Sequence, residues 1–501
     1  MNQPTQPVEK LATGIPGFDV IAQGGLPRAR STLVAGSAGS AKTVFAAQFL
    51  AAGIAAGESG VFVTFEDGVE DIRRNMKGFG WNIEGWERDG KWCFVDASPR
   101  PEETDAVLGE FDLGGLLARI EHAVRRVGAT RVSLDSLNAL FVQYPQHEIL
   151  RGELYRITRA AKALGATVVF TGERIREYGE ISRHGLEEFV ADNVVILRNL
   201  LLDERRRRTI EVLKMRGAGH QRGEFPFTVQ PERGIVALPL SGIPLTQSSS
   251  SVRITSGSAE LDRMCGGGFF RDSVILLSGA TGTGKTLMVT QFLAGGYRDG
   301  ERCLLFAFEE SRDQLYRNAA AWGADFEAME RDGKLKVVSQ YPHSMALEDH
   351  LLLMRDTIDE FRPNRVAVDS LSALERVTSV RSFREFVIGL TSFLKQQEVA
   401  GLFTSTTPSL LGGASVTEKH ISTLTDTIIL LRYVETQGRM RRALTVLKMR
   451  GSPHDHEIRE YRIEATGMKI EGPFVDLTGI LSGNPTLVPA EAGDDGPAAG
   501  Y

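Results

Sequence analysis

The stretch from Gly279 to Gly296, GATGTGKTLMVTQFLAGG, decides the fold. Its first eight residues form the pattern G-x-x-x-x-G-K-T, which follows the apolar run SVILLSG and opens a helix-like pattern. Glycines in such a loop let backbone N–H groups converge on phosphate oxygens at the positive end of a helix dipole. The lysine reaches the β and γ phosphates, and the threonine hydroxyl holds Mg²⁺. We therefore predict a site for ATP with Mg²⁺, comprising Gly279, Ala280, Thr281, Gly282, Thr283, Gly284, Lys285 and Thr286.

The same stretch occurs 243 residues earlier, as GSAGSAKTVFAAQFLAAG from Gly36 to Gly53. VFVTFED and LLFAFEE keep that offset. RVSLDSLNAL and RVAVDSLSAL, DNVVILR and DTIILLR, and the two copies of VLKMRG are 234 residues apart. An offset that changes only once indicates a duplicated unit rather than chance. We predict two domains, 1–240 and 254–486, with a Pro-, Gly- and Ser-rich linker at 241–253 and a flexible acidic tail at 487–501.

Short, almost wholly apolar runs follow one another in each copy. STLVAG, VFVTF, RVSLD, TVVFTG and NVVIL in the first copy correspond to SVILLSG, LLFAF, RVAVD, GLFTST and TIILL in the second. Runs of this kind are typical of strands buried on both faces of a parallel sheet, and TVFAAQFLAAGIAA has the apolar spacing of a helix. The sequence therefore predicts an α/β fold with two tandem P-loop domains, each a mainly parallel sheet flanked by helices.

The composition excludes several classes of protein. The 501 residues are 42% hydrophobic and 24% charged, as in ordinary globular chains. The 64 acidic residues outnumber the 58 basic ones by 6, which disfavours a surface that grips nucleic acid. Three scattered cysteines, Cys93, Cys265 and Cys303, form no disulfide framework or zinc motif. No uncharged apolar run reaches eighteen residues, and the N-terminus lacks an export signal, so we expect a cytoplasmic protein without a membrane segment.

The first P-loop departs from the pattern at one position. Alanine stands where the second copy has Gly284, and its methyl group is costly only if the backbone φ is positive there. The lysine and threonine are retained. We predict a second ATP site, either fully working or weakened by the methyl group, comprising Gly36, Ser37, Ala38, Gly39, Ser40, Ala41, Lys42 and Thr43.

Carboxylates follow two of the apolar strands in each copy. The pairs Glu66–Asp67 and Glu309–Glu310 come at the ends of strands where a parallel sheet would present them to the phosphates. There they can accept a proton from an attacking hydroxyl or orient Mg²⁺. The alternative is a solvated acidic loop. Asp135 and Asp369 stand where a Walker B aspartate belongs, although helix capping is also open. For the metal we expect Thr43, Thr286 and Glu309.

Basic residues lie on late strands. Lys214–Met215–Arg216 and Lys448–Met449–Arg450 recur at the same place in both copies. Because each P-loop already has its lysine, a second cluster indicates contacts with a neighbouring subunit's γ-phosphate. A solvated edge strand is the alternative. The run Arg205 to Arg208 suits exposure or contacts with nucleotide or a neighbour better than nucleic acid.

These motifs together resemble one known family. The duplicated P-loop, CGGGFF, AFEESRDQLYRNA, GLEEFVADNVVILRN and HISTLTDTIILLRYVE are similar to KaiC, the clock ATPase and autokinase, from about residue 10 to about residue 486. The resemblance implies two RecA-like domains per chain in a double-ring hexamer, with ATP between neighbouring subunits. One ring would hydrolyse ATP, and the other would phosphorylate and dephosphorylate its own chain.

The resemblance also implies roles for individual residues. Ser422 and Thr423 match the phosphorylated pair, and Thr417 matches an auxiliary threonine. Glu66 and Glu309 match the general bases of the first and second rings. The residues that match contacts with nucleotide are Phe189, Arg208, Lys214, Met215, Arg216 and His220 in the first ring, and Trp322, Arg442, Lys448, Met449 and Arg450 in the second. Trp322 matches a residue packed against adenine.

The repeat tests the assignment of the phosphorylated pair. At the 234-residue offset, Ser422 and Thr423 correspond to Glu188 and Phe189, which carry no hydroxyl. A phosphoryl acceptor needs an O–H group. Only the second copy can therefore use these positions as acceptors. A capping or turn role for the pair is the alternative.

The resemblance implies partners as well. The tail PAEAGDDGPAAGY does not match the segment that binds the activator KaiA, so a KaiB-like protein is favoured over KaiA, and a downstream signalling protein is a further candidate. Ala41 and Asp67 also depart from the family pattern and leave the rate of first-ring hydrolysis open. Two rival functions share the fold: a RecA- or RadA-like DNA-dependent ATPase, and a scaffold that ATP merely holds together.

Overall fold

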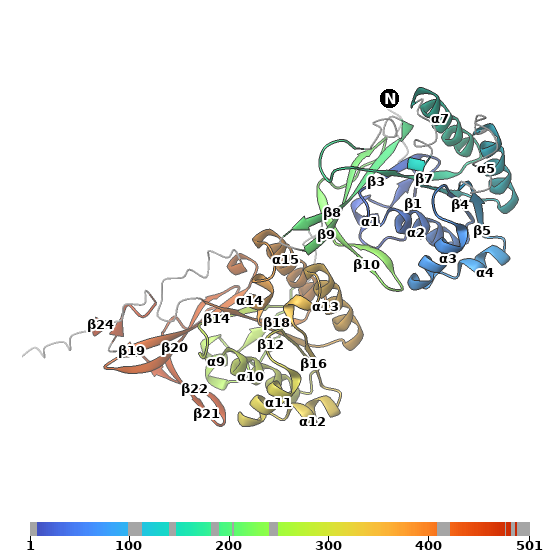
Figure 1. The fold of residues 1–501 in the computed structure, drawn as a ribbon. Helices are drawn as coiled ribbons and strands as arrows, with labels where there is room; N and C mark the ends of the chain where they lie inside the picture. The colour runs from blue at the N-terminus through green and yellow to red at the C-terminus, as the bar shows by residue number, and fades with distance from the viewer. Residues whose placement is uncertain are drawn as a thin grey trace, which may run out of the picture. The chain divides into compact units, whose positions relative to one another are not determined.

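The computed structural model describes residues 8–98, 113–139, 147–181, 190–202, 205–239, 249–407, 421–475, 477–481 and 486–487. The chain divides into two compact units, Met1–Ile243 and Pro244–Tyr501. Each unit contains a nine-stranded sheet with helices on both faces, visible in Figure 1 in blue to green for the first and yellow to red for the second. In the described residues, no helix is both long and apolar enough to cross a membrane.

The first unit follows the strand–helix alternation expected from its sequence. Its elements are β1 (Lys10–Leu11), α1 (Phe18–Ile21), β2 (Leu26–Pro27), β3 (Ser31–Gly36), α2 (Lys42–Ala55), β4 (Gly60–Thr64), α3 (Val69–Met76), η1 (Lys77–Phe79), α4 (Ile83–Arg88), β5 (Trp92–Asp96), α5 (Leu113–Val127), β6 (Arg131–Asp135), α7 (His147–Ala163), β7 (Thr167–Glu173), β8 (Asn193–Leu202), β9 (Arg205–Met215), β10 (Glu224–Gln230) and β11 (Gly234–Ala237).

The second unit repeats this order. Its elements are β12 (Arg253–Ile254), α9 (Ala259–Met264), β13 (Phe269–Phe270), β14 (Val274–Gly279), α10 (Lys285–Arg298), β15 (Cys303–Ala307), α11 (Arg312–Ala321), α12 (Phe326–Arg331), β16 (Leu335–Ser339), η4 (Pro342–Ser344), α13 (Leu347–Phe361), β17 (Arg365–Asp369), α14 (Leu371–Glu375), α15 (Val380–Gln396), β18 (Ala400–Thr406), η5 (Ile421–Thr423), β19 (Thr427–Thr436), β20 (Arg439–Met449), β21 (Arg459–Glu464), β22 (Gly467–Pro473), β23 (Leu477–Thr478) and β24 (Thr486–Leu487).

The two large sheets have equivalent strand orders. They run β5-β4-β6-β7-β3-β8-β9-β10-β11 and β16-β15-β17-β18-β14-β19-β20-β21-β22. In both, the six strands from β5 to β8 or from β16 to β19 pair in parallel, and the remaining strands pair antiparallel. The predicted α/β fold with a mainly parallel sheet is confirmed. The sequence predicts late strands at Lys214 and Lys448 but not their antiparallel pairing, because polar and apolar residues mix along them without a clear period.

Burial explains the apolar runs. Every residue of β3, β4 and β6 is buried, and so is every residue of β14 and β15. In the first unit, one hydrophobic cluster joins the sheet to α1–α4 and another joins it to α5 and α7. In the second unit, α9–α12 and α13–α15 lie on opposite faces of the sheet (Figure 1). Strands covered on both sides have no polar face to present, which is why their sequences do not alternate.

Candidate functional site

Each P-loop follows the central strand of its sheet. Gly36 ends β3 and α2 begins at Lys42; Gly279 ends β14 and α10 begins at Lys285. The lysine ammonium groups fold back onto their own loops. Lys42 Nζ donates to the carbonyls of Gly36 and Ser37 at 2.9 Å each, and Lys285 Nζ donates to those of Gly279 and Ala280 at 3.0 and 2.9 Å. Carbonyls of each P-loop therefore bind the ammonium group of the lysine that follows the loop.

The two P-loops have the same backbone conformation at one position, but its conformational free energy differs between them. Ala41 has φ 71° and ψ 30°, and Gly284 has φ 93° and ψ 26°, so both residues are left-handed. This conformation costs an L-residue with a Cβ about 1–2 kcal/mol, while glycine adopts it freely. The first P-loop therefore carries backbone strain that the second does not. Of the two cases left open by the sequence, the structure has the costly one.

The P-loop threonine meets the Walker B aspartate in the second unit. Thr286 Oγ1 donates to Asp369 Oδ2 at 2.7 Å, and Thr404 Oγ1 donates to Asp369 Oδ1 at 2.5 Å. Burial raises the pKa of Asp369, against the hydrogen bonds from these two threonines. A hydroxyl and a carboxylate oxygen at one point are the hard donors that Mg²⁺ prefers. The residues present therefore fit the metal.

The first unit repeats this arrangement. Thr171 Oγ1 donates to Asp135 Oδ1. Burial raises the pKa of Asp135, while hydrogen bonds from Thr171 and Thr43 lower it. Both buried aspartates thus have a threonine from the P-loop helix and another from the neighbouring strand. Both aspartates therefore lie beside their P-loops, and their role as Walker B residues stays a prediction.

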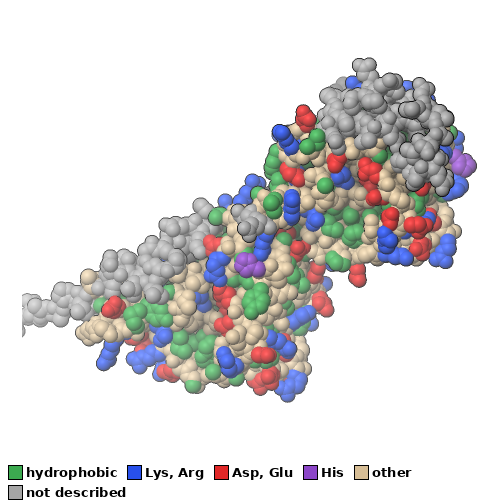
Figure 2. Space-filling model, in the orientation of Figure 1, with side chains coloured by type: hydrophobic (Ala, Val, Ile, Leu, Met, Phe, Trp, Pro, Cys, Tyr) green, Lys and Arg blue, Asp and Glu red, His purple; other side chains and the backbone are tan. Residues whose placement is uncertain are grey.

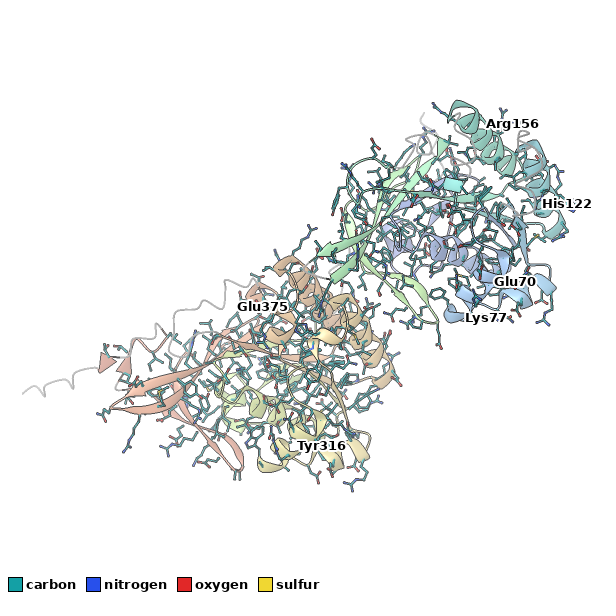
Figure 3. The ribbon with its side chains drawn as sticks, viewed as in Figure 1. Glu70, Lys77, His122, Arg156, Tyr316 and Glu375 are labelled. Atoms are coloured by element: carbon teal, nitrogen blue, oxygen red, sulfur yellow. The ribbon has the colours of Figure 1, made fainter. Side chains whose placement is uncertain are left out.

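The two predicted bases each accept a hydrogen bond from the serine after the Walker B aspartate. Ser136 Oγ donates to Glu66 Oε1 at 2.9 Å, and Ser370 Oγ donates to Glu309 Oε2 at 3.0 Å. Both glutamates are exposed. Arg376 forms an ion pair with Glu309 Oε1. Arg376 directly follows Glu375, the last residue of α14, which is labelled in Figure 3. The repeat places a valine at the position of Arg376 in the first copy, so this ion pair belongs to the second unit.

The second member of each acidic pair is held differently. Asn318 Nδ2 donates to Glu310 Oε2 at 2.9 Å, and burial, followed by the negative charge of Asp369, raises the pKa of Glu310. Asp67 is exposed, and its carbonyl accepts from Thr64 Oγ1 at 2.6 Å. The side chain of Glu310 therefore belongs to the protein interior more than that of Asp67.

The predicted acceptor pair lies at the amino-terminal ends of the parallel strands of the second sheet, and the P-loop lies at their carboxyl-terminal ends. Ser422 and Thr423 are the last two residues of η5, just before β19, and Asp426 N donates to Val274 O at 2.8 Å at the start of β14. The P-loop begins at the other end of β14, five residues away or about 16 Å at about 3.3 Å per residue. Ser422 is buried and Thr423 is exposed.

The second-unit basic residues converge on the acceptor pair. Lys448 Nζ donates to the carbonyls of Ser422 and Thr425 at 2.7 Å each, and Arg450 Nη2 donates to the carbonyl of Thr423 at 2.8 Å. Burial, then the charge of Arg450, lowers the pKa of Lys448. Cations and hydroxyl-bearing residues are thus brought together in a single cluster at this edge.

The first unit has the cations at the same edge. Lys214 Nζ donates to the carbonyl of Ala191 at 2.9 Å, and Arg216 lies 3.9 Å from Asp192. His220 is half-buried in the following loop, and burial lowers its pKa. Phe189 and Thr417 lie outside the described residues.

Some predicted residues are placed elsewhere. Arg208 Nε donates to the carbonyl of Gly39 at 3.1 Å, in its own P-loop, away from Lys214. Arg442 packs over Tyr433, whose hydroxyl would lie 2.7 Å from a Cβ at Gly282 in the second P-loop. Met215 and Met449 are only 7% exposed and lie in hydrophobic clusters. The methionine side chains therefore serve the core.

Two further observations concern the surface. Trp322 is half-buried just after α11, the helix on which Figure 3 labels Tyr316. The run from Arg205 to Arg208 is built into β9, where Arg206 Nη1 donates to the carbonyl of Asn199 at 2.9 Å. On the face drawn in Figure 2, acidic and basic side chains are interspersed among the described residues of each unit. The described residues on this face therefore form no basic stripe of the kind that binds nucleic acid.

Sequence reasoning missed several residues at the first P-loop. Glu173 ends β7 and accepts from Asn138 Nδ2 at 2.9 Å, and Glu177 accepts from Ser37 Oγ at 2.5 Å. Burial lowers the pKa of Lys42, against the negative charges of Asp135, Glu173, Glu66 and Glu177. The available signal was a glutamate directly after the strand TVVFTG, where the second copy has threonine.

The fold and the paired loop, threonine and aspartate define a duplicated P-loop ATPase, a class that binds ATP. A family model for the KaiC ATPase matches residues 11–241 and 254–473. The chain therefore belongs to the KaiC family, in agreement with the resemblance in its motifs.

Curated relatives cover nearly the whole chain. It is 65% identical to the circadian clock protein KaiC3 of Synechocystis sp. over 485 residues, or 97% of this chain and 96% of the relative. It is 53% identical to the circadian clock oscillator protein KaiC of Thermostichus vulcanus over 487 residues, covering 97% and 93% of the two chains. It is 52% identical to the protein of that name from Synechococcus elongatus over 488 residues, covering 97% and 94%. These relatives favour a KaiC-type ATPase over a DNA-dependent ATPase.

Proposed function

We propose that this chain is an ATP-dependent autokinase and ATPase with autophosphatase activity. It would work in a timing or signalling system as a homohexamer with Mg²⁺ and a KaiB-like partner. In the first unit ATP would be hydrolysed by water. In the second unit the γ-phosphoryl group would pass to Ser422 or Thr423 of a neighbouring chain. The proposal rests on the KaiC family membership and on one geometric observation in the second unit.

That observation is the separation of acceptor and P-loop within one chain. Ser422 and Thr423 lie at the amino-terminal edge of the parallel strands, while Lys285 lies at the carboxyl-terminal edge. A side chain at the start of β14 cannot reach a γ-phosphate held by the P-loop, because the strand that separates them is about 16 Å long. A neighbour that brings its amino-terminal edge to this P-loop supplies the acceptor hydroxyls together with Lys448 and Arg450. Transfer across a subunit boundary satisfies both placements.

The proposed step uses residues with defined roles. The acceptor oxygen forms a bond with the γ-phosphorus, the bond from that phosphorus to the bridging oxygen of ADP breaks, and the hydroxyl proton goes to Glu309. Ser370 and Arg376 orient the Glu309 carboxylate. Lys285 and the neighbour's basic residues offset the charge that develops on the phosphoryl oxygens. Mg²⁺, when bound by Thr286 and Asp369, would neutralise phosphate charge.

A double variant tests the proposal. Ser422→Ala with Thr423→Ala removes both acceptor hydroxyls and leaves both P-loops intact. Incubated with γ-labelled ATP and Mg²⁺, it should incorporate less than a tenth of the wild-type label while continuing to release phosphate. Thr436→Ala, at the far end of β19, is the matched control and should label normally. Undiminished labelling of the double variant would refute the acceptor assignment, and absent phosphate release would favour the scaffold instead.

A further inference from the structure

Glu173 lies between the two halves of the first nucleotide site. Strand β7 runs between β3, which ends in the P-loop, and β6, which ends in Asp135. Glu173 is paired in register with Gly36, the first P-loop residue, and the next backbone N–H, of Arg174, donates to the carbonyl of Gly36 at 3.1 Å. The last residue of β7 is therefore fixed beside the phosphate-binding loop.

The carboxylate of Glu173 is held from the Walker B side. Asn138, three residues after Asp135, donates its Nδ2–H to Glu173 Oε2 at 2.9 Å. Glu173 is half-buried. A carboxylate carries about four lone-pair sites, so that of Glu173 can accept several hydrogen bonds at once. The side chain thus meets the two needs of an orienting group, a fixed position and acceptor capacity.

The second unit has a different pair at these positions. Thr406 ends β18 opposite Gly279, and Thr407 N donates to the carbonyl of Gly279 at 3.2 Å, so the backbone is equivalent. Ser372 replaces Asn138 in the repeat, and its Oγ accepts from Thr406 N at 2.8 Å. A glutamate–asparagine pair in the first unit is therefore a threonine–serine pair in the second. The second unit, which carries the proposed acceptor hydroxyls, therefore has a threonine and no carboxylate at the position of Glu173.

We propose that Glu173, positioned by Asn138, orients the attacking water in the first unit and so selects water as the phosphoryl acceptor there. The inference rests on the proposed function of this site. The water oxygen bonds to the γ-phosphorus, the bond to the bridging oxygen of ADP breaks, and one water proton passes to Glu66. Glu173 accepts a hydrogen bond from the other O–H of the same water, which fixes the direction of attack.

The experiment isolates the first unit in the full chain. A background carrying Glu309→Gln, Ser422→Ala and Thr423→Ala removes the second-unit acceptors and base, so phosphate release with Mg·ATP reports the first site. Into it are placed Glu173→Thr, which copies the second unit, and Glu173→Gln, which keeps an oxygen for Asn138 and removes the charge. Glu180→Gln, exposed in the same loop, is the matched control, and thermal unfolding checks each fold.

The expected result is a fall in kcat of at least fivefold in both Glu173 variants, with KM for ATP changed less than twofold and the Glu180 control unaltered. A merely structural role would move KM or the unfolding temperature and would spare the Gln variant. A fall in kcat of less than fivefold in Glu173→Gln overturns the inference. Glu66→Gln in the same background distinguishes the role of Glu173 from the proposed function of the first site. If Glu66→Gln does not reduce hydrolysis, the proposed function of the site is refuted.

Discussion

The two units share one scaffold, and the difference in chemistry that we propose for them is carried by a few side chains near the P-loops and before β19. Both have a buried aspartate, the predicted Walker B residue, held by two threonines, and both have a glutamate, the proposed base, held by a serine. The first unit adds Glu173 at its P-loop, while the second adds Arg376 on Glu309 and two hydroxyls before β19. On the proposed function, a duplicated sheet keeps its phosphate-binding core and changes the phosphoryl acceptor through residues around that core.

The largest effect should come from removing the two bases separately. Glu309→Gln should reduce incorporation of label into the chain by about 100-fold or more, the usual range for a general base. Glu66→Gln should leave that incorporation largely intact and reduce phosphate release. Labelling and phosphate release measured in parallel on both variants check the division. Equal loss of both activities in either variant would mean that the units do not divide the chemistry in this way.

A methyl group in the second P-loop should have an intermediate effect. Gly284→Ala places a Cβ at a left-handed residue, 3.1 Å from Ile463 Cδ1 and 3.3 Å from Met468 Cε. The backbone cost is about 1–2 kcal/mol, or about tenfold in ATP affinity if it falls on the bound conformation. Titration of ATP against a chain whose first site is blocked by Lys42→Ala measures it. Unchanged affinity would show that the loop adapts without strain.

The reverse change in the first P-loop should have the smallest effect. Ala41→Gly relieves the left-handed alanine but adds flexibility to the unfolded chain, so the net gain should be about 1 kcal/mol. If this gain falls on the ATP-bound conformation, as for Gly284→Ala, it corresponds to about a fivefold rise in ATP affinity at the first site. Binding to chains carrying Lys285→Ala checks it. Weaker binding would indicate that the methyl group makes a useful contact with the neighbouring hydrophobic cluster.

The sequence was sufficient for the fold and the phosphate-binding core. The motif at Gly279 and its repeat at Gly36 predicted both P-loops. Unbroken apolar runs in the sequence predicted the strands that are buried on both faces. The sequence could not show that Ala41 is left-handed, since a local pattern does not specify φ. It also could not place Glu173 or Arg376, because these contacts join residues from different strands and depend on register.

The basic residues were predicted as one group and are divided in space. Arg208 lies at its own P-loop, whereas Lys214 and Arg216 lie at the other edge of the sheet. Strand β9 runs antiparallel to β8 and carries these residues from one edge to the other. Only the direction and length of the strand decide which edge each residue reaches, and the spacing of charges in the sequence does not reveal them.

Transfer between chains is the central claim, and a mixture of two variants tests it most directly. One chain carries Lys285→Ala, which disables its second P-loop but keeps its hydroxyls; the other carries Ser422→Ala and Thr423→Ala, which keeps the P-loop. After subunit exchange with γ-labelled ATP and Mg²⁺, label should appear on the Lys285→Ala chain and be absent when that chain is incubated alone. Label on the Lys285→Ala chain alone, or none in the mixture while wild type is labelled, would contradict the account.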